Sequence, residues 1–394
     1  MKIIAAKYLI PIYSEPIKNG YIKLDDQGTI IEIGTYDSNT MDADYYDGII
    51  CPGFTNAHCH VELSHMKGIF KENTGMSGFI NQINALRLTI DKQGRINALK
   101  EQLQYMYNQG ISAMGDICNC DESFEAKSKS KIFTRNFIEL FGTFPDEAEK
   151  VISEGNVIKE QAESYNLKAS LTPHSCYTTS SKLIAMAAAE GLKEGYISYH
   201  NQESIEEEEL LIKGTGPLAD NYKGRNLMTP PITGKPALLY FIDSLRKKLD
   251  TPINGKILLV HNTATNEESI DYALNYLKEP FWVICPLSNY FIHRVLPPLD
   301  IMRKKNLSIC VGTDSLSSNK ILSIIEELKC IQNNFNHIEL PEMLKWACIN
   351  GATAIGKEKT LGTFEIGKKP GVVFIDKITD NLKLTEESSS HRIY

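Results

Sequence analysis

The sequence lacks the features that mark membrane, secreted and nucleic-acid-binding proteins. No apolar run approaches the roughly 20 residues that a membrane-spanning helix requires. The opening stretch, MKIIAAKYLIPIYSEPIKNG, brings in charge and proline too early for a signal peptide. Asp and Glu outnumber Lys and Arg by 49 to 42, the net charge is −7, and the basic residues form no recognisable stripe. We therefore expect a cytoplasmic protein that binds neither a membrane nor a nucleic-acid polymer.

The cysteines do not form the pattern of a disulfide framework. There are nine of them, an odd number without regular spacing, which fits a reducing compartment. Cys118 and Cys120 in DICNC are the only close pair, and no second half follows that would complete a zinc knuckle.

The chain has 394 residues and is 42% hydrophobic, so it can bury a large core. Residues 1–50 contain short β-rich runs separated by turns, as in NGYIKLDDQGTIIEIGTYD, and residues 358–394 return to this character with LGTFEIGKKPGVVFIDK. We expect the two chain ends to pair into one small β domain, and residues 51–357 to form a second domain.

Within the second domain, apolar strand-like runs alternate with amphipathic helix-like segments. The strand-like runs are residues 48–54, 111–117, 131–140, 167–173, 195–200, 256–261, 281–286 and 307–313. The clearest helical segments are residues 95–109, 181–190, 236–249, 268–278 and 321–335. Eight strand and helix units predict an α/β fold with a parallel sheet, closed as a (β/α)8 barrel of the TIM type.

Polar side chains stand where these apolar runs end. In chain order they are His58, His60, Asp116, His174, His200, His261, Asn289 and Asp314. Because the chemistry of such barrels gathers at the C-terminal ends of the strands, this distribution predicts a functional site there.

Four of these residues form a set that can hold a divalent metal. His58 and His60 lie two residues apart, so an extended backbone directs both imidazoles to one side. On its own this pair is explained equally well by a packed strand end. With His200 and Asp314 it makes three nitrogen donors and one carboxylate, which suit zinc, with iron as the alternative. The ion would lower the pKa of a bound water and supply hydroxide.

Three residues are predicted to carry the proton transfers. Glu203 follows His200 by three residues and can pass protons from the water to a leaving nitrogen. His261 can donate a hydrogen bond to the attacking water or stabilise charge on the tetrahedral adduct. Asp314 can accept the first proton besides binding the metal.

The motifs PGFTNAHCH, HNQE, LVHN, CPLSN and GTDSLSSN occur in the order expected of the amidohydrolase superfamily, and they resemble its aminohydrolase and chlorohydrolase branch. NGATAIG followed by LGTFEIGKKPGVVFID resembles the return from the barrel into that family's small β-sandwich. The resemblance implies a barrel with a composite β-sandwich, often a homodimer, and one metal ion. It assigns His58, His60, His200 and Asp314 as ligands, and Glu203 and His261 as proton-handling residues.

The end of the fourth strand, LTPHSCYTTS, has no acid or lysine that could bridge two metals, so one ion is expected. The resemblance implies that His174, in this segment, contacts the substrate. Asn289 is a further predicted substrate contact. Glu62 either faces the pocket and binds an N–H edge of the substrate or is an ordinary loop acid.

The predicted function is hydrolytic deamination of a small heterocycle, of a purine or nucleoside type, in which hydroxide attacks the amine-bearing ring carbon and ammonia leaves. Adenine-containing nucleosides, guanine and triazines are all compatible with these residues. The alternatives are a related amidohydrolase that opens a cyclic amide or displaces a halide, and a non-catalytic barrel scaffold. Residues 211–236, rich in glycine and proline, could form a loop over the mouth.

Overall fold

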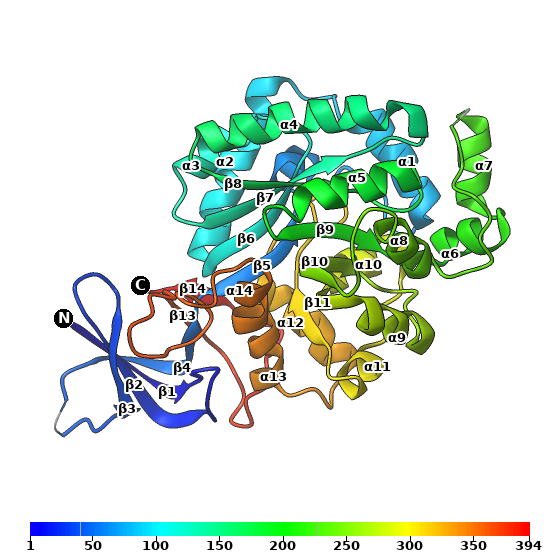
Figure 1. Ribbon diagram of the computed structural model, residues 1–394. Coiled ribbons are helices and arrows are strands. Elements are labelled where there is room, and N and C mark those ends of the chain that lie inside the picture. Colours follow the sequence, from blue (N-terminus) through cyan, green and yellow to red (C-terminus); the bar gives the residue numbers. More distant parts are fainter. Residues whose placement is uncertain (40, 226) are drawn as a thin grey trace.

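The computed structural model describes residues 1–39, 41–225 and 227–394. The strands form one six-stranded sheet and two four-stranded sheets. Figure 1 shows the six-stranded sheet beside a larger body in which helices surround the other two. No helix in the described part of the chain is both long and apolar enough to cross a membrane.

The six-stranded sheet joins the two ends of the chain, as the sequence predicted. Its order is β14-β13-β4-β1-β2-β3, with β13 antiparallel to β4 and β1 parallel to β4. The strands are β1 (Lys2–Leu9), β2 (Ile17–Leu24), β3 (Ile30–Thr35), β4 (Asp44–Pro52), β13 (Val372–Ile375) and β14 (Ser390–Arg392). These strands make a single sheet, so the two-layered β-sandwich stays a prediction.

The two four-stranded sheets are parallel throughout, in the orders β5-β6-β7-β8 and β12-β11-β10-β9. Their strands are β5 (Phe54–Cys59), β6 (Ile111–Cys118), β7 (Phe133–Leu140), β8 (Lys168–Pro173), β9 (Tyr196–Asn201), β10 (Ile253–His261), β11 (Leu277–Ile284) and β12 (Ser308–Val311). Seven of the eight predicted runs overlap these strands closely. Such sheets are buried on both faces, which is why their strands read as continuous apolar runs.

The first predicted strand, residues 48–54, was placed wrongly. Residues 49–52 belong to β4 and pair with β13 in the terminal sheet, whereas the parallel strand starts at Phe54. Gly53 separates the two, and a Cβ there would come within 2.4 Å of the Pro370 carbonyl oxygen. The second half of β4 and the whole of β5 are buried, so hydrophobicity shows no boundary between them. Only their pairing partners, which are distant in sequence, reveal it.

Hydrogen bonds cross both seams between the two parallel sheets. At the seam of β8 and β9, the backbone N–H of His200 donates to the carbonyl of His174 at 2.9 Å. At the seam of β12 and β5, the N–H of Thr313 donates to the carbonyl of His58 at 2.9 Å. The seams therefore fix histidines of one sheet against the other sheet.

Helices pack around the parallel strands, with α4 and α5 against β7 and β8 (Figure 1). The helices are α1 (Gly75–Leu86), α2 (Lys92–Asn108), α3 (Phe124–Ser128), α4 (Ala148–Ser164), α5 (Ser181–Gly191), α6 (Ile205–Lys213), α7 (Pro217–Gly224), α8 (Ala237–Leu245), α9 (Glu267–Tyr276), α10 (Pro286–His293), α11 (Leu299–Lys304), α12 (Ile324–Asn334), α13 (Leu340–Lys345) and α14 (Gly351–Ala354). The five predicted helical segments correspond to α2, α5, α8, α9 and α12.

The seam between β12 and β5 predicts the effect of a single added methyl group. A Cβ at Gly312 would lie 2.8 Å from the carbonyl oxygen of His58, and this backbone cannot move aside without shifting β5. We expect Gly312→Ala to lower the free energy of unfolding by about 1–3 kcal/mol, as overpacking usually does. Thermal unfolding measures the effect.

Gly224→Ala at the end of α7 is the matched control, because a Cβ there meets nothing within 4 Å. We expect this variant to unfold at the temperature of the unaltered protein or slightly above it. Equal unfolding temperatures for the two variants would contradict the close approach of β12 to β5.

Candidate metal centre

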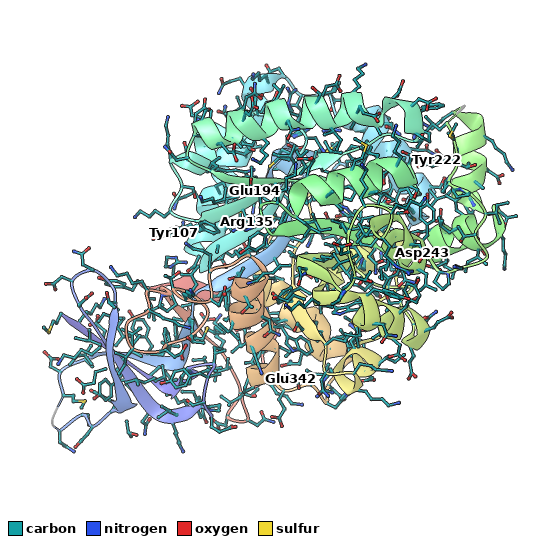
Figure 2. All side chains as sticks on the ribbon, viewed as in Figure 1. Tyr107, Arg135, Glu194, Tyr222, Asp243 and Glu342 are labelled. Carbon is teal, nitrogen blue, oxygen red and sulfur yellow. The ribbon has the colours of Figure 1, made fainter. Side chains whose placement is uncertain are left out.

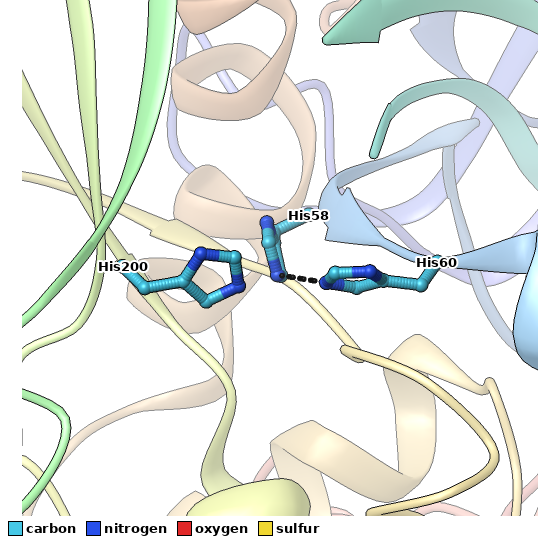
Figure 3. A group of neighbouring side chains, drawn as sticks. All are labelled: His58, His60 and His200. Carbon is cyan, nitrogen blue, oxygen red and sulfur yellow. Dashed lines mark hydrogen bonds between the residues drawn. The ribbon is translucent and has the colours of Figure 1, made fainter. Parts of the chain in front are cut away.

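Three histidines from two sheets meet at the C-terminal ends of the parallel strands. His58 lies near the end of β5 and His60 directly follows it, with their Nε2 atoms 3.2 Å apart. His200 lies on β9, and one ligand atom from each of the three residues falls within 4.8 Å of the others. Figure 3 shows a ring nitrogen of His200 directed toward His58 and His60. The tertiary structure therefore brings the three nitrogens within reach of one ion.

Asp314 completes this cluster, and its two carboxylate oxygens have different partners. Its Oδ1 lies 3.5 Å from Nε2 of His60 and 3.8 Å from Nε2 of His58. Its Oδ2 accepts hydrogen bonds from the hydroxyls of Ser288 and Ser318, each at 2.6 Å. The serines fix the carboxylate so that Oδ1 faces the imidazoles. Both belong to motifs quoted above, but their role depends on a contact that the motifs do not reveal.

Burial and charge set the protonation of the cluster. Burial lowers the pKa of His58 and of His200 well below the usual value, which keeps both imidazoles neutral at pH 7. Burial alone would raise the pKa of Asp314, but His60, His261 and His58 outweigh it and lower the pKa to about 2. Neutral imidazole nitrogens with an ionised carboxylate fit a divalent metal such as zinc or iron.

Glu203 and His261 lie beside this cluster. The backbone N–H of Glu203 donates to Glu207 at 2.7 Å, at the start of α6. Oε1 of Glu203 lies 3.5 Å from Nε2 of His261, and Oε2 accepts a hydrogen bond from the hydroxyl of Tyr177 at 3.4 Å. Nδ2 of Asn289 donates to Nδ1 of His261 at 3.0 Å, which leaves the ring proton of His261 on Nε2.

The same environment shifts these two groups in opposite directions. Burial, together with the charge of Asp314, raises the pKa of Glu203 well above that of an exposed glutamate. Burial lowers the pKa of His261 to about 4. At neutral pH His261 is therefore uncharged, while Glu203 retains a proton far more readily than an exposed carboxyl does.

A cavity of about 500 Å³ opens above these residues. Its polar lining includes His60, Glu139, His174, His200, Glu203, His261 and Asp314. Its apolar wall is formed by Leu63, Met76, Phe79, Ile80, Ile83, Phe141, Phe144 and Leu227. The volume is in the range of pockets that hold small organic ligands, roughly 300–1,000 Å³.

Of the three predicted substrate contacts, His174 lines the cavity, whereas Asn289 and Glu62 are not part of its lining. His174 lines the cavity, and its Nδ1 lies 2.8 Å from the Ser175 hydroxyl and 2.6 Å from the Thr178 hydroxyl. Asn289 is buried outside the lining and bonds to His261 instead. Glu62 is also absent from the lining, so the structure does not place it as a substrate contact.

The Glu62 carboxylate is occupied by the protein. It accepts a hydrogen bond from the backbone N–H of Asn119 at 3.1 Å, and Nη2 of Arg87 lies 3.6 Å from its Oε1. The sequence left two interpretations of Glu62 open, an acid that faces the pocket and an ordinary loop acid. The structure shows a third arrangement, in which the acid ties the segment after β6 to the segment after β5.

The glycine- and proline-rich segment 211–236 is only partly a loop. Its first residues end α6, and α7 (Pro217–Gly224) follows, while residue 226 lies outside the described part. Tyr222 on α7, labelled in Figure 2, lines the cavity together with Arg225 and Leu227, and its hydroxyl donates to the carbonyl of Tyr177. A helix thus contributes to the cavity wall where a loop was expected.

Asp116 and Lys127 form a fully buried ion pair next to the histidine pair. Oδ1 of Asp116 also accepts a hydrogen bond from the backbone N–H of Val61 at 2.9 Å. The ion pair therefore holds the backbone that follows His60. Asp116 could be named from the sequence because it stands where an apolar run ends. Lys127 lies on the short helix α3, and no sequence pattern indicates that it is buried.

Two relatives resemble most of the chain. An adenosine deaminase of Helicobacter pylori is 28% identical over 359 residues, which cover 84% of this chain and 82% of that protein. An aminodeoxyfutalosine deaminase of Nitratiruptor sp. is 27% identical over 358 residues, covering 88% of this chain and 83% of that protein.

Solved structures share the fold. The aminofutalosine deaminase of Helicobacter pylori in complex with methylthio-coformycin superposes with a TM-score of 0.77 at 23% identity, covering 98% of this chain and 94% of that chain. The zinc complex of an atrazine chlorohydrolase from Arthrobacter aurescens gives a TM-score of 0.73 at 14% identity, covering 95% and 86%.

The profile of the amidohydrolase family matches residues 49–392, and the chain belongs to this family. The protein is therefore a hydrolase that acts on carbon–nitrogen bonds.

The buried ion pair predicts a large loss of stability when one partner is removed. Lys127→Met leaves Asp116 as a buried charge without its cation, and we expect the free energy of unfolding to fall by about 3–5 kcal/mol. Lys129→Met is the matched control, because Lys129 makes an exposed pair with Glu125 close by in the same segment. We expect that control to leave the urea midpoint nearly unchanged. Similar midpoints for both variants would contradict a clamping role for Lys127.

Proposed function

We propose that the protein is a metal-dependent hydrolytic deaminase of a heterocyclic small molecule of the purine or nucleoside type. The observation that carries this proposal is the placement of Glu203. A buried carboxyl with a raised pKa faces His261 beside a cluster of three imidazoles and one carboxylate, at the floor of a cavity that suits a small ligand.

The proposal includes the architecture. We propose that the two parallel sheets form one closed (β/α)8 barrel within the predicted range 51–357, and that residues 1–50 and 358–394 form a separate β domain. The end of β4, at Cys51 and Pro52, belongs to that β domain. The hydrogen bonds across both seams support closure, since they link β8 to β9 and the end of β12 to β5. In such a barrel the C-terminal strand ends surround one site.

His58, His60, His200 and Asp314 would hold the metal ion, with zinc as the expected ion and iron as the alternative. A divalent ion in such a donor set lowers the pKa of water enough to supply hydroxide near neutral pH. The serine hydroxyls on Oδ2 of Asp314 keep its Oδ1 directed toward the imidazoles, so the carboxylate is held in place before any ion binds.

Glu203 is proposed to move the protons of the reaction. A carboxyl buried at the cavity can give its proton to the ring nitrogen of the substrate, take up a proton from the attacking water, and pass that proton to the departing amine. Its raised pKa favours the protonated form with which this sequence begins. The Tyr177 hydroxyl and the backbone contact with Glu207 hold the side chain in place.

His261 is proposed to stabilise the charge that develops during attack. It is neutral, its Nδ1 accepts from Asn289, and its Nε2–H points toward the Glu203 carboxyl and the cavity. A fixed donor of this kind stabilises a tetrahedral adduct without rearranging. Asn289 therefore acts through His261 rather than on the substrate.

The volume and lining of the cavity are compatible with a heterocycle that carries a further group. His174 and Tyr177 line the cavity together with apolar residues such as Met76 and Phe144. The relatives named as deaminases of adenosine and aminodeoxyfutalosine support an adenine-type ring. His174 is retained as a proposed substrate contact.

Displacement of a halide is the second candidate, because the fold is shared with an atrazine chlorohydrolase. The acid-and-histidine pair of Glu203 and His261 favours deamination, since an amine needs a proton to leave. A scaffold without catalysis is disfavoured because His58, His60 and His200 lie close enough to share one ion and Asp314 lies 3.5 Å from His60.

Glu203→Gln tests the proton transfer directly. The amide keeps the shape of the side chain but cannot exchange a proton, so we expect the turnover number to fall by about 10²- to 10⁴-fold. Zinc content, measured by atomic absorption, should stay at the level of the unaltered protein. Glu209→Gln, in the acidic run that begins α6, is the matched control and should keep full turnover. Full turnover in the Glu203 variant would remove the assignment.

A substrate panel tests the reaction class. We expect the zinc-loaded protein to release ammonia from adenine-containing nucleosides, measured by a coupled ammonia assay. Guanine, a chlorinated triazine and a cyclic amide complete the panel. Chloride release or ring opening without ammonia would favour the second candidate, and a zinc-loaded protein that converts no compound would favour the scaffold.

A further inference from the structure

Glu139 is a buried acidic residue in the cavity lining, and it has no role in the reaction proposed above. It lies at the end of β7, and only 6% of its surface is exposed. Its Oε2 accepts a hydrogen bond from the side-chain amide of Asn119 at 3.1 Å. Its Oε1 is shielded from solvent and has no hydrogen-bond partner in the described structure. Burying such an oxygen without a donor is costly, so its surroundings must supply one.

The nearest donor is an imidazole of the predicted metal centre. Oε1 of Glu139 lies 3.3 Å from Nδ1 of His200 and 3.9 Å from Nε2 of His174. The same Nδ1 lies 3.3 Å from the backbone carbonyl oxygen of His174. The backbone carbonyl oxygen of His174 can only accept a hydrogen bond. Nδ1 must therefore carry the ring proton, and it can share this proton between the two acceptors.

The position of the proton decides which nitrogen of His200 can bind a metal. With the proton on Nδ1, the lone pair lies on Nε2. A histidine that donates its other N–H to a carboxylate is fixed in ring orientation and tautomer, and becomes a stronger ligand. His58 differs in this respect, because its Nδ1 has no partner in the described structure.

We propose that Glu139 is a positioning residue, which accepts a hydrogen bond from Nδ1–H of His200 and thereby orients Nε2 of that histidine for metal binding. This inference rests on the metal centre of the proposed function, but not on the substrate. The contact links Glu139 on β7 to His200 on β9, beside the seam where β8 and β9 meet.

Two other roles for Glu139 fit the structure less well. A second ion between Glu139, His174 and His200, whose ligand atoms lie within 4.8 Å of one another, would need an unprotonated Nδ1 on His200. The His174 carbonyl requires that proton. Glu139 lines the cavity, but its Oε1 is shielded from solvent and lies 3.3 Å from Nδ1 of His200, which favours the imidazole over a substrate hydroxyl as its donor.

Zinc affinity tests the proposal without any turnover. Affinity is measured by competition with a chromophoric chelator for the unaltered protein, Glu139→Gln, Glu139→Leu and the exposed control Glu154→Gln. We expect Glu139→Leu to weaken zinc binding by about 10- to 100-fold, the usual effect of losing such a partner. Glu139→Gln keeps a neutral acceptor and should lose less. The control should match the unaltered protein.

A double-mutant cycle separates positioning from general support of the fold. Each Glu139 substitution is repeated in a His200→Asn background, and thermal unfolding of the metal-free proteins checks that each variant is folded. If Glu139 acts through His200, its substitution should change zinc affinity by less than twofold in that background.

The proposal is overturned if both Glu139 variants bind zinc as tightly as the unaltered protein. It is also overturned if their effects add to that of His200→Asn, or if the unaltered protein binds two zinc ions per chain and Glu139→Gln binds one. A protein that binds zinc but releases no ammonia contradicts the proposed function alone, because the affinity cycle does not depend on turnover.

Discussion

The candidate metal centre depends on side chains from separate parallel strands that meet at one point. His58 belongs to one four-stranded sheet, and His200 belongs to the other. Asp314 follows β12, and its backbone N–H donates to the carbonyl of His58 at 3.1 Å. If either seam between the sheets opened, the donors would separate and no ion could be shared. Gly312 permits this approach because any larger residue would meet His58.

Buried groups without catalytic roles maintain this arrangement. The Lys127 and Asp116 pair holds the backbone after His60, while Ser288 and Ser318 hold Asp314. In each case a buried polar group has a hydrogen-bond or ion-pair partner, which offsets the cost of its burial. Burial in these surroundings keeps the imidazoles neutral and raises the pKa of the Glu203 carboxyl. The same burial therefore makes the supporting partners necessary and sets the protonation of the site.

The residues that local patterns could identify were those that end an apolar run. His58, His60, His200, Glu203, His261 and Asp314 were all named from the sequence, and the structure brings them together. The exact start of the first strand could not be predicted, because the second half of β4 and the whole of β5 are buried and differ only in their pairing. Asn289 was predicted to contact substrate, and Glu62 was either a pocket acid or a loop acid. The hydrogen bonds of both residues go to other parts of the protein.

The sequence by itself determined the alternation of strands and helices, the joining of the two chain ends into one sheet, and the polar residues at the strand ends. These follow from hydrophobic periodicity, which is a local property. Only the tertiary structure decided which side chains support the centre, such as Glu139 and Lys127, and which line the cavity, such as Phe141 and Tyr222. Those roles depend on contacts between segments far apart in sequence, and no local spacing encodes such contacts.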